Sequence, residues 1–214
     1  MNTYTAKFIV GLLPGEPLDS LSKRMDELER APIGNVPWPE FSYQPMVSFA
    51  LAYDVENIYL KYYVEEHATR AIYTEIHDPV FKDSCVEFFV RFGKESSYYN
   101  LEFNCLGVCL GGYRTGRESK TIIAAELLRK IKSITVFDRN PGEAFENKWQ
   151  ITLMIPLSSF CYSNIGNLKG ENARANFYKC GDDLPQPHYL SWSPVDTPQP
   201  DFHRPEFFGV LQFR

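Results

Sequence analysis

Two glutamates in this chain are spaced so that their carboxyl groups could act together on one ligand. Glu87 lies in the segment CVEFFVRF and Glu102 in the segment YYNLEFN, and a turn-rich stretch at 93–96 separates the two. Folded as an antiparallel hairpin about this turn, the segments place Glu87 opposite Glu102 and Cys85 opposite Asn104. Two carboxylates about 5 Å apart repel by about 3 kcal/mol at an effective dielectric of about 20. The pair therefore needs a nearby cation or good contact with water.

A second polar stripe is predicted in the segment RANFYKC. Side chains alternate between the two faces of a strand, so one face of this segment carries Arg174, Asn176 and Tyr178. If the segment shares a sheet with the hairpin, these side chains join Glu87, Glu102 and Asn104 in one patch. Arg114 and Arg174 are the candidate counter-ions for the glutamates, and calcium is the alternative.

A patch of this composition suits the hydroxyl groups of a sugar. Carboxylates, amides and guanidinium groups are planar, and each can hold two hydroxyls at once. The apolar faces of a sugar ring also need flat surfaces, and covering roughly 50–80 Å² of an aromatic ring contributes about 1–2 kcal/mol. Trp192 and Trp38 lie in proline-flanked loops, and Phe81 precedes the hairpin. We predict Trp192 and Phe81 as two aromatic platforms at the border of the patch.

Each of these interpretations has a plainer alternative. The polar patch could be the solvated outer face of a sheet with incidental charge pairs. A single tryptophan more often anchors a core or a loop, which is what we expect of Trp149 in the segment KWQITLMIP. The whole chain could then be a structural or interaction domain without a sugar ligand, or a haem-binding domain with Met154 as an axial ligand.

An enzyme is the least favoured interpretation. Glu87 and Glu102 could be the two carboxyl groups of a glycoside hydrolase, but nothing in the sequence indicates the deep cleft that would raise one pKa. The chain has no nucleophile elbow, phosphate-binding loop, zincin helix or dinucleotide-binding loop. Its four histidines lie in loops without the spacing of metal ligands. We expect no catalytic activity.

Composition and charge exclude several kinds of partner. The 214 residues carry a net charge of −5, which disfavours nucleic acids and anionic membranes. No apolar run reaches the roughly 18 residues that span a bilayer. The five cysteines form no C-x-x-C pair and are expected to be small buried residues. The first residues do not resemble a secretion signal, so the protein is expected in the cytoplasm if the chain is complete, and in the periplasm or outside the cell if a signal was removed. We expect a monomer.

The elements that must position these residues are mostly strands. Period-two patterns predict strands at 47–53, 58–65, 85–92, 98–104, 132–138, 149–155, 173–179 and 209–213. Apolar residues at helical spacing predict one helix at 17–31, capped by Asp19 or Ser20, and the segment 121–131 could form a short second helix. Many short strands with little helix predict an all-β fold, a two-sheet antiparallel β-sandwich. We expect a single domain over 1–214, with residues 1–45 packed on the sandwich as helix and loop.

Six motifs then occur in a recognisable order. They are D-S-x-V-E-x-F from Asp83, Y-Y-N-x-E-F-N-x-x-G from Tyr98, W-x-x-x-x-x-I-P from Trp149, R-x-N-F-Y from Arg174, L-S-W-S-P from Leu190 and H-x-P-x-F-F-G from His203. Over residues 45–214 the chain resembles the carbohydrate-binding module family 9-like domains, which are related to DOMON domains. It is most similar to the stand-alone type of gut Bacteroidetes.

This resemblance implies a β-sandwich with structural calcium, and Asp78, Asp83, Asp182, Asp183 and Asp201 are the available ligands. In xylanase-linked members it also implies that the reducing-end sugar of xylan or cellulose lies between two aromatic rings. Phe81 and Trp192 match those rings, although the first is usually Trp. Glu87 matches the glutamate that binds sugar hydroxyls, with Arg114, Arg174 and Asn176 as its helpers. We therefore predict non-catalytic carbohydrate binding.

Overall fold

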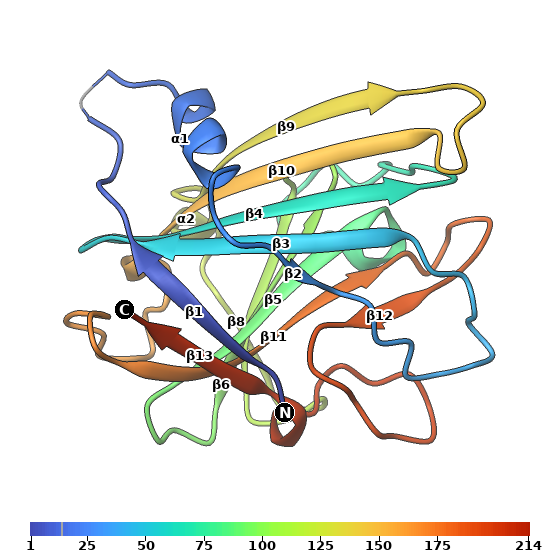
Figure 1. Cartoon of the computed structure of the whole chain (residues 1–214). Coiled ribbons are helices and arrows are strands. Elements are labelled where there is room, and N and C mark those ends of the chain that lie inside the picture. Colours follow the sequence, from blue (N-terminus) through green and yellow to red (C-terminus); the bar gives the residue numbers. More distant parts are fainter. Residues whose placement is uncertain (14) are drawn as a thin grey trace.

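The computed structural model describes residues 1–13 and 15–214, and it is built mainly of strands (Figure 1). Pro14, in the N-terminal stretch considered above as a possible leader, lies outside the described residues. Neither of the two α-helices among those residues is long and apolar enough to cross a lipid bilayer. The all-β fold predicted from the alternating segments is confirmed.

One sheet carries all of the segments in which polar residues were predicted to gather. We call it sheet A, and it follows the order β8-β7-β6-β5-β11-β13, with β12 paired to β11. Its strands are β5 (Cys85–Phe92), β6 (Tyr98–Asn104), β7 (Cys109–Arg114), β8 (Lys120–Ile122), β11 (Asn172–Cys180), β12 (Tyr189–Ser191) and β13 (Gly209–Phe213). These neighbours are antiparallel.

The second sheet, sheet B, follows the order β3-β4-β10-β9, with the short β2 paired to β3. Its strands are β2 (Ala31–Pro32), β3 (Met46–Tyr53), β4 (Asn57–Glu66), β9 (Lys132–Arg139) and β10 (Asn147–Pro156). These pairs are also antiparallel. The eight strands predicted from the sequence are all present, with bounds that differ by at most two residues.

Strand β1 (Thr3–Phe8) joins the two sheets and departs from the antiparallel prediction. Its first part pairs with β13 and its last two residues pair with β3, and both pairings are parallel. Figure 1 shows this strand in blue beside the dark red β13. Tyr4 and Ala6 point into the core, and the Leu51 N–H donates to the Tyr4 hydroxyl at 2.9 Å. The strand closes one side of the sandwich.

The core lies between the inner faces of the two sheets. Phe49 of β3 stacks on Phe177 of β11 with ring centroids 3.7 Å apart, so the sheets are in direct contact. The apolar residues predicted to share the inner face of the hairpin belong to this core: Val86, Phe88, Val90, Tyr99, Leu101 and Phe103. Burial of such large side chains is the main stabilising contribution in a sandwich of this size.

One charged network crosses the core. The Lys179 Nζ of β11 lies 3.0 Å from a carboxylate oxygen of Glu66 of β4, and both side chains are fully buried. The Lys179 ammonium also donates to the Cys180 carbonyl and lies 2.8 Å from His188 Nε2. The Trp149 indole N–H donates to the other Glu66 oxygen at 2.7 Å. The network links sheet A to sheet B.

The helices are shorter than predicted. Helix α1 (Leu18–Met25) follows Pro17 without a side-chain cap, so the predicted caps Asp19 and Ser20 are wrong. Leu21 and Met25 pack on sheet B as the helical spacing indicated. Beyond Met25 the chain is held by Asp26, whose carboxylate accepts from Lys61 at 2.7 Å and from Tyr63 at 2.8 Å. In the segment 121–131, α2 (Ala125–Leu128) is a single short turn after β8.

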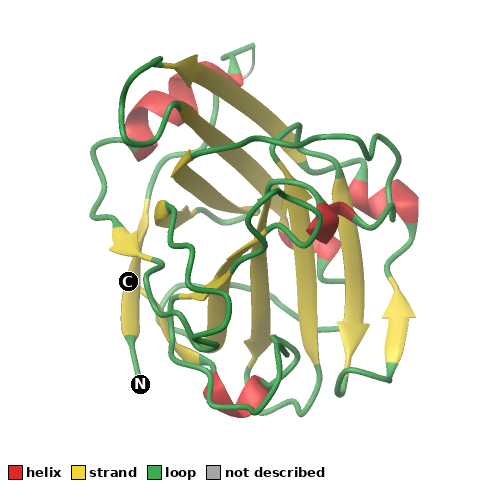
Figure 2. Ribbon diagram, turned by 90° about the vertical axis from the view of Figure 1, so that its right-hand side faces the viewer, coloured by secondary structure: helices red, strands yellow, loops and turns green. Residues whose placement is uncertain are grey.

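Loops cover the outer face of sheet A. Figure 2 shows loops crossing in front of strands on the side that faces the viewer. A second apolar cluster forms on this face between the sheet and the covering loops: Trp38, Phe89, Tyr98, Tyr178, Val195 and Phe208. The outer face of sheet A is therefore largely enclosed, and a site on it must lie in whatever space the loops leave open.

Candidate functional site

The register of sheet A brings the predicted polar residues together. Glu87 lies opposite Glu102 and Cys85 lies opposite Asn104, as the hairpin prediction required. On the other side of β5, Tyr178 lies opposite Glu87 and Asn176 lies opposite Phe89. The alternation of RANFYKC is also confirmed, since Ala175 and Phe177 point into the core. One outer face thus carries the polar residues of three adjacent strands.

This face does not lie open to water, which corrects the predicted surface patch. Glu87 is only 3% exposed and Glu102 only 4%. The covering loops leave a pocket of about 360 Å³ above the two carboxyl groups. Its lining comprises Trp38, Phe81, Glu87, Glu102, Leu110, Arg114, Arg117, Glu118, Lys120, Cys180, Asp182, Tyr189, Pro200, Asp201, Phe202 and His203.

Four aromatic side chains form one part of the pocket wall. Phe81 belongs to a short 3₁₀ turn ahead of β5, and Tyr189 begins β12. Trp38 and Phe202 come from the covering loops and pack against each other with centroids 5.6 Å apart. The indole N–H of Trp38 donates to the Thr197 carbonyl at 2.9 Å, which fixes the ring. The pocket therefore offers flat apolar surfaces beside its polar floor.

The two glutamates on the floor are incompletely hydrogen-bonded. Glu102 accepts from the Asn100 side-chain amide at 2.8 Å through one oxygen, and its other oxygen is buried without a partner. Glu87 accepts from the Cys180 thiol at 3.1 Å. Burial raises the pKa of Glu87 well above its usual range, with a further contribution from the Glu102 charge, and burial raises the pKa of Glu102 to about 7.

Basic side chains form the opposite wall. The Arg114 Nε donates to the Asn100 side-chain oxygen at 3.0 Å, and one of its terminal nitrogens donates to the Arg117 carbonyl at 2.5 Å. Lys120, directly opposite Arg114 across the β7–β8 ladder, also lines the pocket. Burial and then the charge of Arg114 lower the pKa of Lys120. The predicted counter-ion Arg114 therefore acts on Glu102 through Asn100.

Asp182 and His203, which also line the pocket, have shifted pKa values. Burial raises the pKa of Asp182 to about 6. Burial, followed by the charge of Arg114, lowers the pKa of His203 to about 3, so its imidazole is neutral at pH 7. The His203 ring stacks on Phe89 with centroids 5.1 Å apart, and its Nδ1 lies 3.1 Å from the Tyr98 hydroxyl. The pocket thus combines hydrogen-bond acceptors, donors and aromatic rings within a small volume.

The predicted platform Trp192 is wrong. Its side chain is only 3% exposed and packs in the core against Phe49 and Phe177, on the inner face of sheet A. The ring takes this place because residue 209 is glycine. A Cβ at Gly209 would lie 2.4 Å from a carbon of the Trp192 ring. The accessible aromatic surfaces of the pocket come instead from Phe81, Tyr189 and Phe202, because Trp38 borders the pocket but is itself only 2% exposed.

Four other predicted site residues do not line the pocket. Asn176 holds the chain at Ser193 through two hydrogen bonds of 2.8 and 3.0 Å. Tyr178 stacks beneath Phe202 at 4.0 Å and donates its hydroxyl to the Phe202 carbonyl. Arg174 lies opposite Arg91 on β5 and contacts Met1, so it is not a counter-ion of the glutamates. Asn104 donates to Asp83.

The aspartates expected to bind calcium are not gathered into one site. Asp83 is fully buried and already accepts from the Arg70 guanidinium, the N–H groups of Ile72 and Tyr73, and Asn104. Asp78 accepts two backbone N–H groups of its own loop. Asp182 and Asp201 line the pocket, whereas Asp183 lies near Arg70 and Lys82. These residues do not fit the oxygen-rich shell that calcium requires.

Several pocket residues were missed by the sequence prediction. Tyr189 begins the short strand β12, and Phe202 and His203 come from the irregular chain after it. Lys120 is the first residue of the three-residue strand β8, and Arg117 lies shortly before it. The aromatic pocket residues could have been recognised from the many aromatic side chains between residues 189 and 208, in a segment with little regular structure. Such rings need partners, and the covered face of a sheet provides them.

Comparisons with known proteins agree with this architecture. The family model described as carbohydrate-binding family 9 matches residues 19–213. The crystal structure of a candidate carbohydrate-binding protein from Bacteroides uniformis ATCC 8492 is similar over 99% of both chains, with 36% identity and a TM-score of 0.88. No protein of curated function matched the chain.

Two more distant structures come from Caldicellulosiruptor kristjanssonii and are described as carbohydrate-binding modules of family 9. The one in complex with glucose has 14% identity and a TM-score of 0.63, covering 100% of this chain and 96% of that chain. The one in complex with cellotriose has 13% identity and a TM-score of 0.61, covering 100% and 94%. At these identities the likeness concerns the fold.

Proposed function

Because the chain belongs to carbohydrate-binding family 9, we propose that it binds carbohydrate without catalysis, in the pocket above Glu87 and Glu102. The ligand is one sugar ring or chain end of a plant-type polysaccharide such as xylan or cellulose. Its hydroxyls bind the polar floor, and its apolar faces lie against the aromatic wall. Glucose and cellotriose in two structures of similar fold support a neutral sugar as the ligand.

The observation that carries this proposal is the buried Glu102 oxygen without a hydrogen-bond partner. A buried acceptor left unpaired costs about 1–3 kcal/mol, so a ligand that donates to it is favoured. Water can occupy the same place until a sugar hydroxyl replaces it. The pocket volume of about 360 Å³ is in the range of small-ligand sites, and the partly exposed rings of Phe81 and Tyr189 supply apolar surface.

The same geometry argues against hydrolysis. In glycoside hydrolases the two carboxyl groups flank the scissile bond from different sides. Glu87 and Glu102 are direct neighbours across one ladder and rise from the same floor. Both can therefore approach only one side of a bound ring, which suits recognition of adjacent hydroxyls. We expect wild-type protein to release no product from aryl glycosides or cello-oligosaccharides, measured by colour release and by chromatography.

Substitution of the floor carboxylate tests the proposal directly. Glu102→Gln keeps the shape but removes the charge, so we expect the affinity for cellotriose to fall about 10-fold or more, as for the loss of a charged hydrogen bond. The matched control is Glu126→Gln, because Glu126 is exposed on α2 outside the pocket lining. Isothermal titration with glucose, cellotriose and xylotriose provides the measurement. Unchanged affinity in Glu102→Gln, or no binding of any sugar by the wild type, contradicts the proposal.

The aromatic wall provides a second test. Phe81→Ala removes one flat surface, and we expect cellotriose affinity to fall about 5- to 30-fold, equivalent to about 1–2 kcal/mol of lost apolar contact. Phe137→Ala is the control, because Phe137 is 49% exposed on β9 of the other sheet. Affinity electrophoresis in xylan or cellulose-derivative gels compares the two variants. Equal retardation of both variants and the wild type counts against a role for Phe81.

A further inference from the structure

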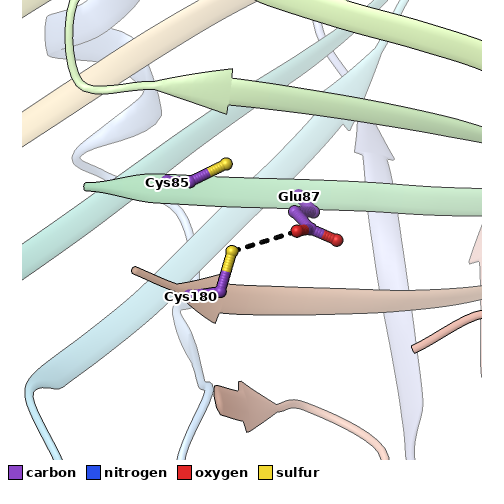
Figure 3. Close-up of side chains that lie close together, drawn as sticks. All are labelled: Cys85, Glu87 and Cys180. Carbon is purple, nitrogen blue, oxygen red and sulfur yellow. Dashed lines mark hydrogen bonds between the residues drawn. The ribbon is translucent and has the colours of Figure 1, made fainter. Parts of the chain in front are cut away.

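Two cysteines and one of the pocket glutamates form a compact cluster on the outer face of sheet A (Figure 3). Cys85 and Glu87 are alternate residues of β5 and so share a face, and Cys180 of β11 lies directly opposite Cys85. Their two sulfur atoms and one carboxylate oxygen all lie within 4.8 Å of one another. No other group of three His, Cys, Asp or Glu residues this close occurs among residues 1–13 and 15–214.

The cluster is buried, and its carboxyl group is poorly hydrogen-bonded. Cys85 is 0% exposed, Cys180 is 1% and Glu87 is 3%. The Glu87 carboxyl receives only the weak thiol donor of Cys180, and within the described part of the chain it forms no ion pair with Lys or Arg. A buried carboxyl with so weak a partner, beside a second carboxyl at Glu102, is unusual and calls for a cation or a ligand.

We propose that Cys85, Glu87 and Cys180 bind one thiophilic divalent cation, with zinc as the best-fitting example. Two sulfurs and one carboxylate oxygen are ligands that zinc accepts in tetrahedral sites. Glu87 and Cys180 line the pocket, so the fourth position faces the pocket and is open to water or to a ligand hydroxyl. This site goes beyond the sugar-binding function and does not depend on it.

The spacing needs little adjustment to reach metal-binding geometry. Zinc–sulfur bonds of about 2.3 Å and zinc–oxygen bonds of about 2.0–2.2 Å place the ligand atoms roughly 3.5–3.8 Å apart in a tetrahedron. The Cys180 sulfur and a Glu87 oxygen are already 3.1 Å apart, and no pair exceeds 4.8 Å. Figure 3 shows the second Glu87 oxygen pointing away from the cysteines, so this oxygen remains free for a pocket ligand.

Binding of the cation must displace the protons of the two cysteine thiols. Burial raises the pKa of Cys85 to about 12 and that of Cys180 well above its usual range, so both are thiols in the free protein. The cation forms two metal–sulfur bonds and one metal–oxygen bond as the thiol protons, with any proton on Glu87, pass to solvent. No electron is transferred, and no oxidant or reductant is needed.

The test uses the full-length reduced protein and cobalt(II) chloride as a spectroscopic substitute for zinc. We expect a thiolate-to-cobalt charge-transfer band that saturates at one ion per chain and disappears when zinc chloride is added. Cys85→Ser, Cys180→Ser and Glu87→Gln should each weaken binding at least 10-fold, with circular dichroism to confirm that each variant is folded. Cys161→Ser is the matched control, because Cys161 is an exposed thiol outside the cluster.

Three outcomes contradict the site. They are the absence of the band in reduced wild-type protein, an undiminished cobalt affinity in Cys180→Ser, and a band that is lost in Cys161→Ser. A Cys85–Cys180 disulfide, seen as a mass two hydrogens lower and followed by no cobalt binding after reduction, also overturns it. Sugar titrations in the presence of a chelator are scored separately, so failure of the metal site and failure of sugar binding are distinguishable.

Discussion

Trp38 and Trp192 lie on opposite faces of sheet A and have different roles. Trp192 packs between the sheets against Phe49 and Phe177, whereas Trp38 packs above the outer face and borders the pocket. Both stand in proline-flanked loops, so their local sequences do not distinguish them. What separates them is Gly209, which leaves room for the ring of Trp192 on the inner face.

This difference gives a prediction at the level of single residues. Trp192→Phe leaves a cavity in the core, so we expect the free energy of unfolding to fall by about 1–3 kcal/mol. The affinity for sugar should stay within about twofold of the wild type, because the residue does not line the pocket. Urea denaturation and isothermal titration measure the two effects. A large loss of sugar affinity in a variant of normal stability would show that Trp192 takes part in sugar binding.

His203 gives a pH dependence of stability. The surrounding charged and titratable groups are Arg114, Arg117, Lys120, Asp201 and Tyr98. Burial, then the nearby positive charges, lower its pKa to about 3, against roughly 6.5 in an unfolded chain. Between these pH values the unfolded state binds the proton and the folded state does not, so this contribution to stability is complete above pH ~6.5 and falls as the pH drops towards 3.

His203→Gln removes that proton uptake. We expect the variant to lose less stability than the wild type between pH 7 and pH 4, measured as the unfolding midpoint in urea at each pH. The comparison with the wild type is needed because Glu102, whose raised pKa makes protonation favour the folded state, acts in the opposite direction. Parallel pH profiles for the two proteins would show that His203 takes up its proton equally well when folded.

At the scale of elements, alternation predicted the strands and their faces well. The hairpin of β5 and β6 and the polar face of β11 follow from the period of two, because a strand has no other way to arrange its side chains. Strand β7 was missed because its sequence CLGGYR looks like a turn. Its glycines are required by packing: a Cβ at Gly111 would lie 2.7 Å from a Leu128 methyl, and one at Gly112 would lie 2.7 Å from the Asn100 side-chain oxygen.

The candidate site could be predicted only in part, because alternation places residues in strands but not residues in loops. Glu87 and Glu102 were found because ladder register places them, and Arg114 was named as a candidate counter-ion although its strand was missed. Phe81 was named because it precedes the hairpin and matches an aromatic ring of the family that the chain resembles. Trp38, Phe202 and His203 reach the pocket through long loops, whose path over the sheet has no sequence period. The alternation correctly grouped the polar residues, but it contains no information on whether a loop covers them.

The buried pair between β11 and β4 gives a prediction at this scale. Lys179→Met removes one charge and leaves Glu66 unpaired in the core, so we expect a loss of about 3–5 kcal/mol in the free energy of unfolding. The double variant Lys179→Met with Glu66→Gln should recover a large part of that loss, because no lone charge remains. Urea denaturation of the two single variants and the double variant gives the coupling energy. Additive losses would show that the two charges do not stabilise each other.

At the scale of the whole molecule, β1 holds the two sheets together along one side. Deletion of residues 1–8 exposes the edges of β13 and β3 and removes Tyr4 and Ala6 from the core. We expect a loss on the order of 3–5 kcal/mol from lost apolar burial and hydrogen bonds. Thermal unfolding should show recovery when a synthetic peptide of residues 1–8 is added in excess. Lys7→Ala, an exposed position of the same strand, is the control for substitution within β1.

The pairing of β1 with β13 also has a consequence for how the protein is made. Strand β1 is translated long before its sheet A partner β13, at residues 209–213. Until residues 209–213 have emerged from the ribosome, the edge of β1 that pairs with β13 has no partner, and this long-range pairing is expected to be a slow folding step. Nascent chains stalled before residue 209 should therefore be digested readily by a protease that spares the released protein.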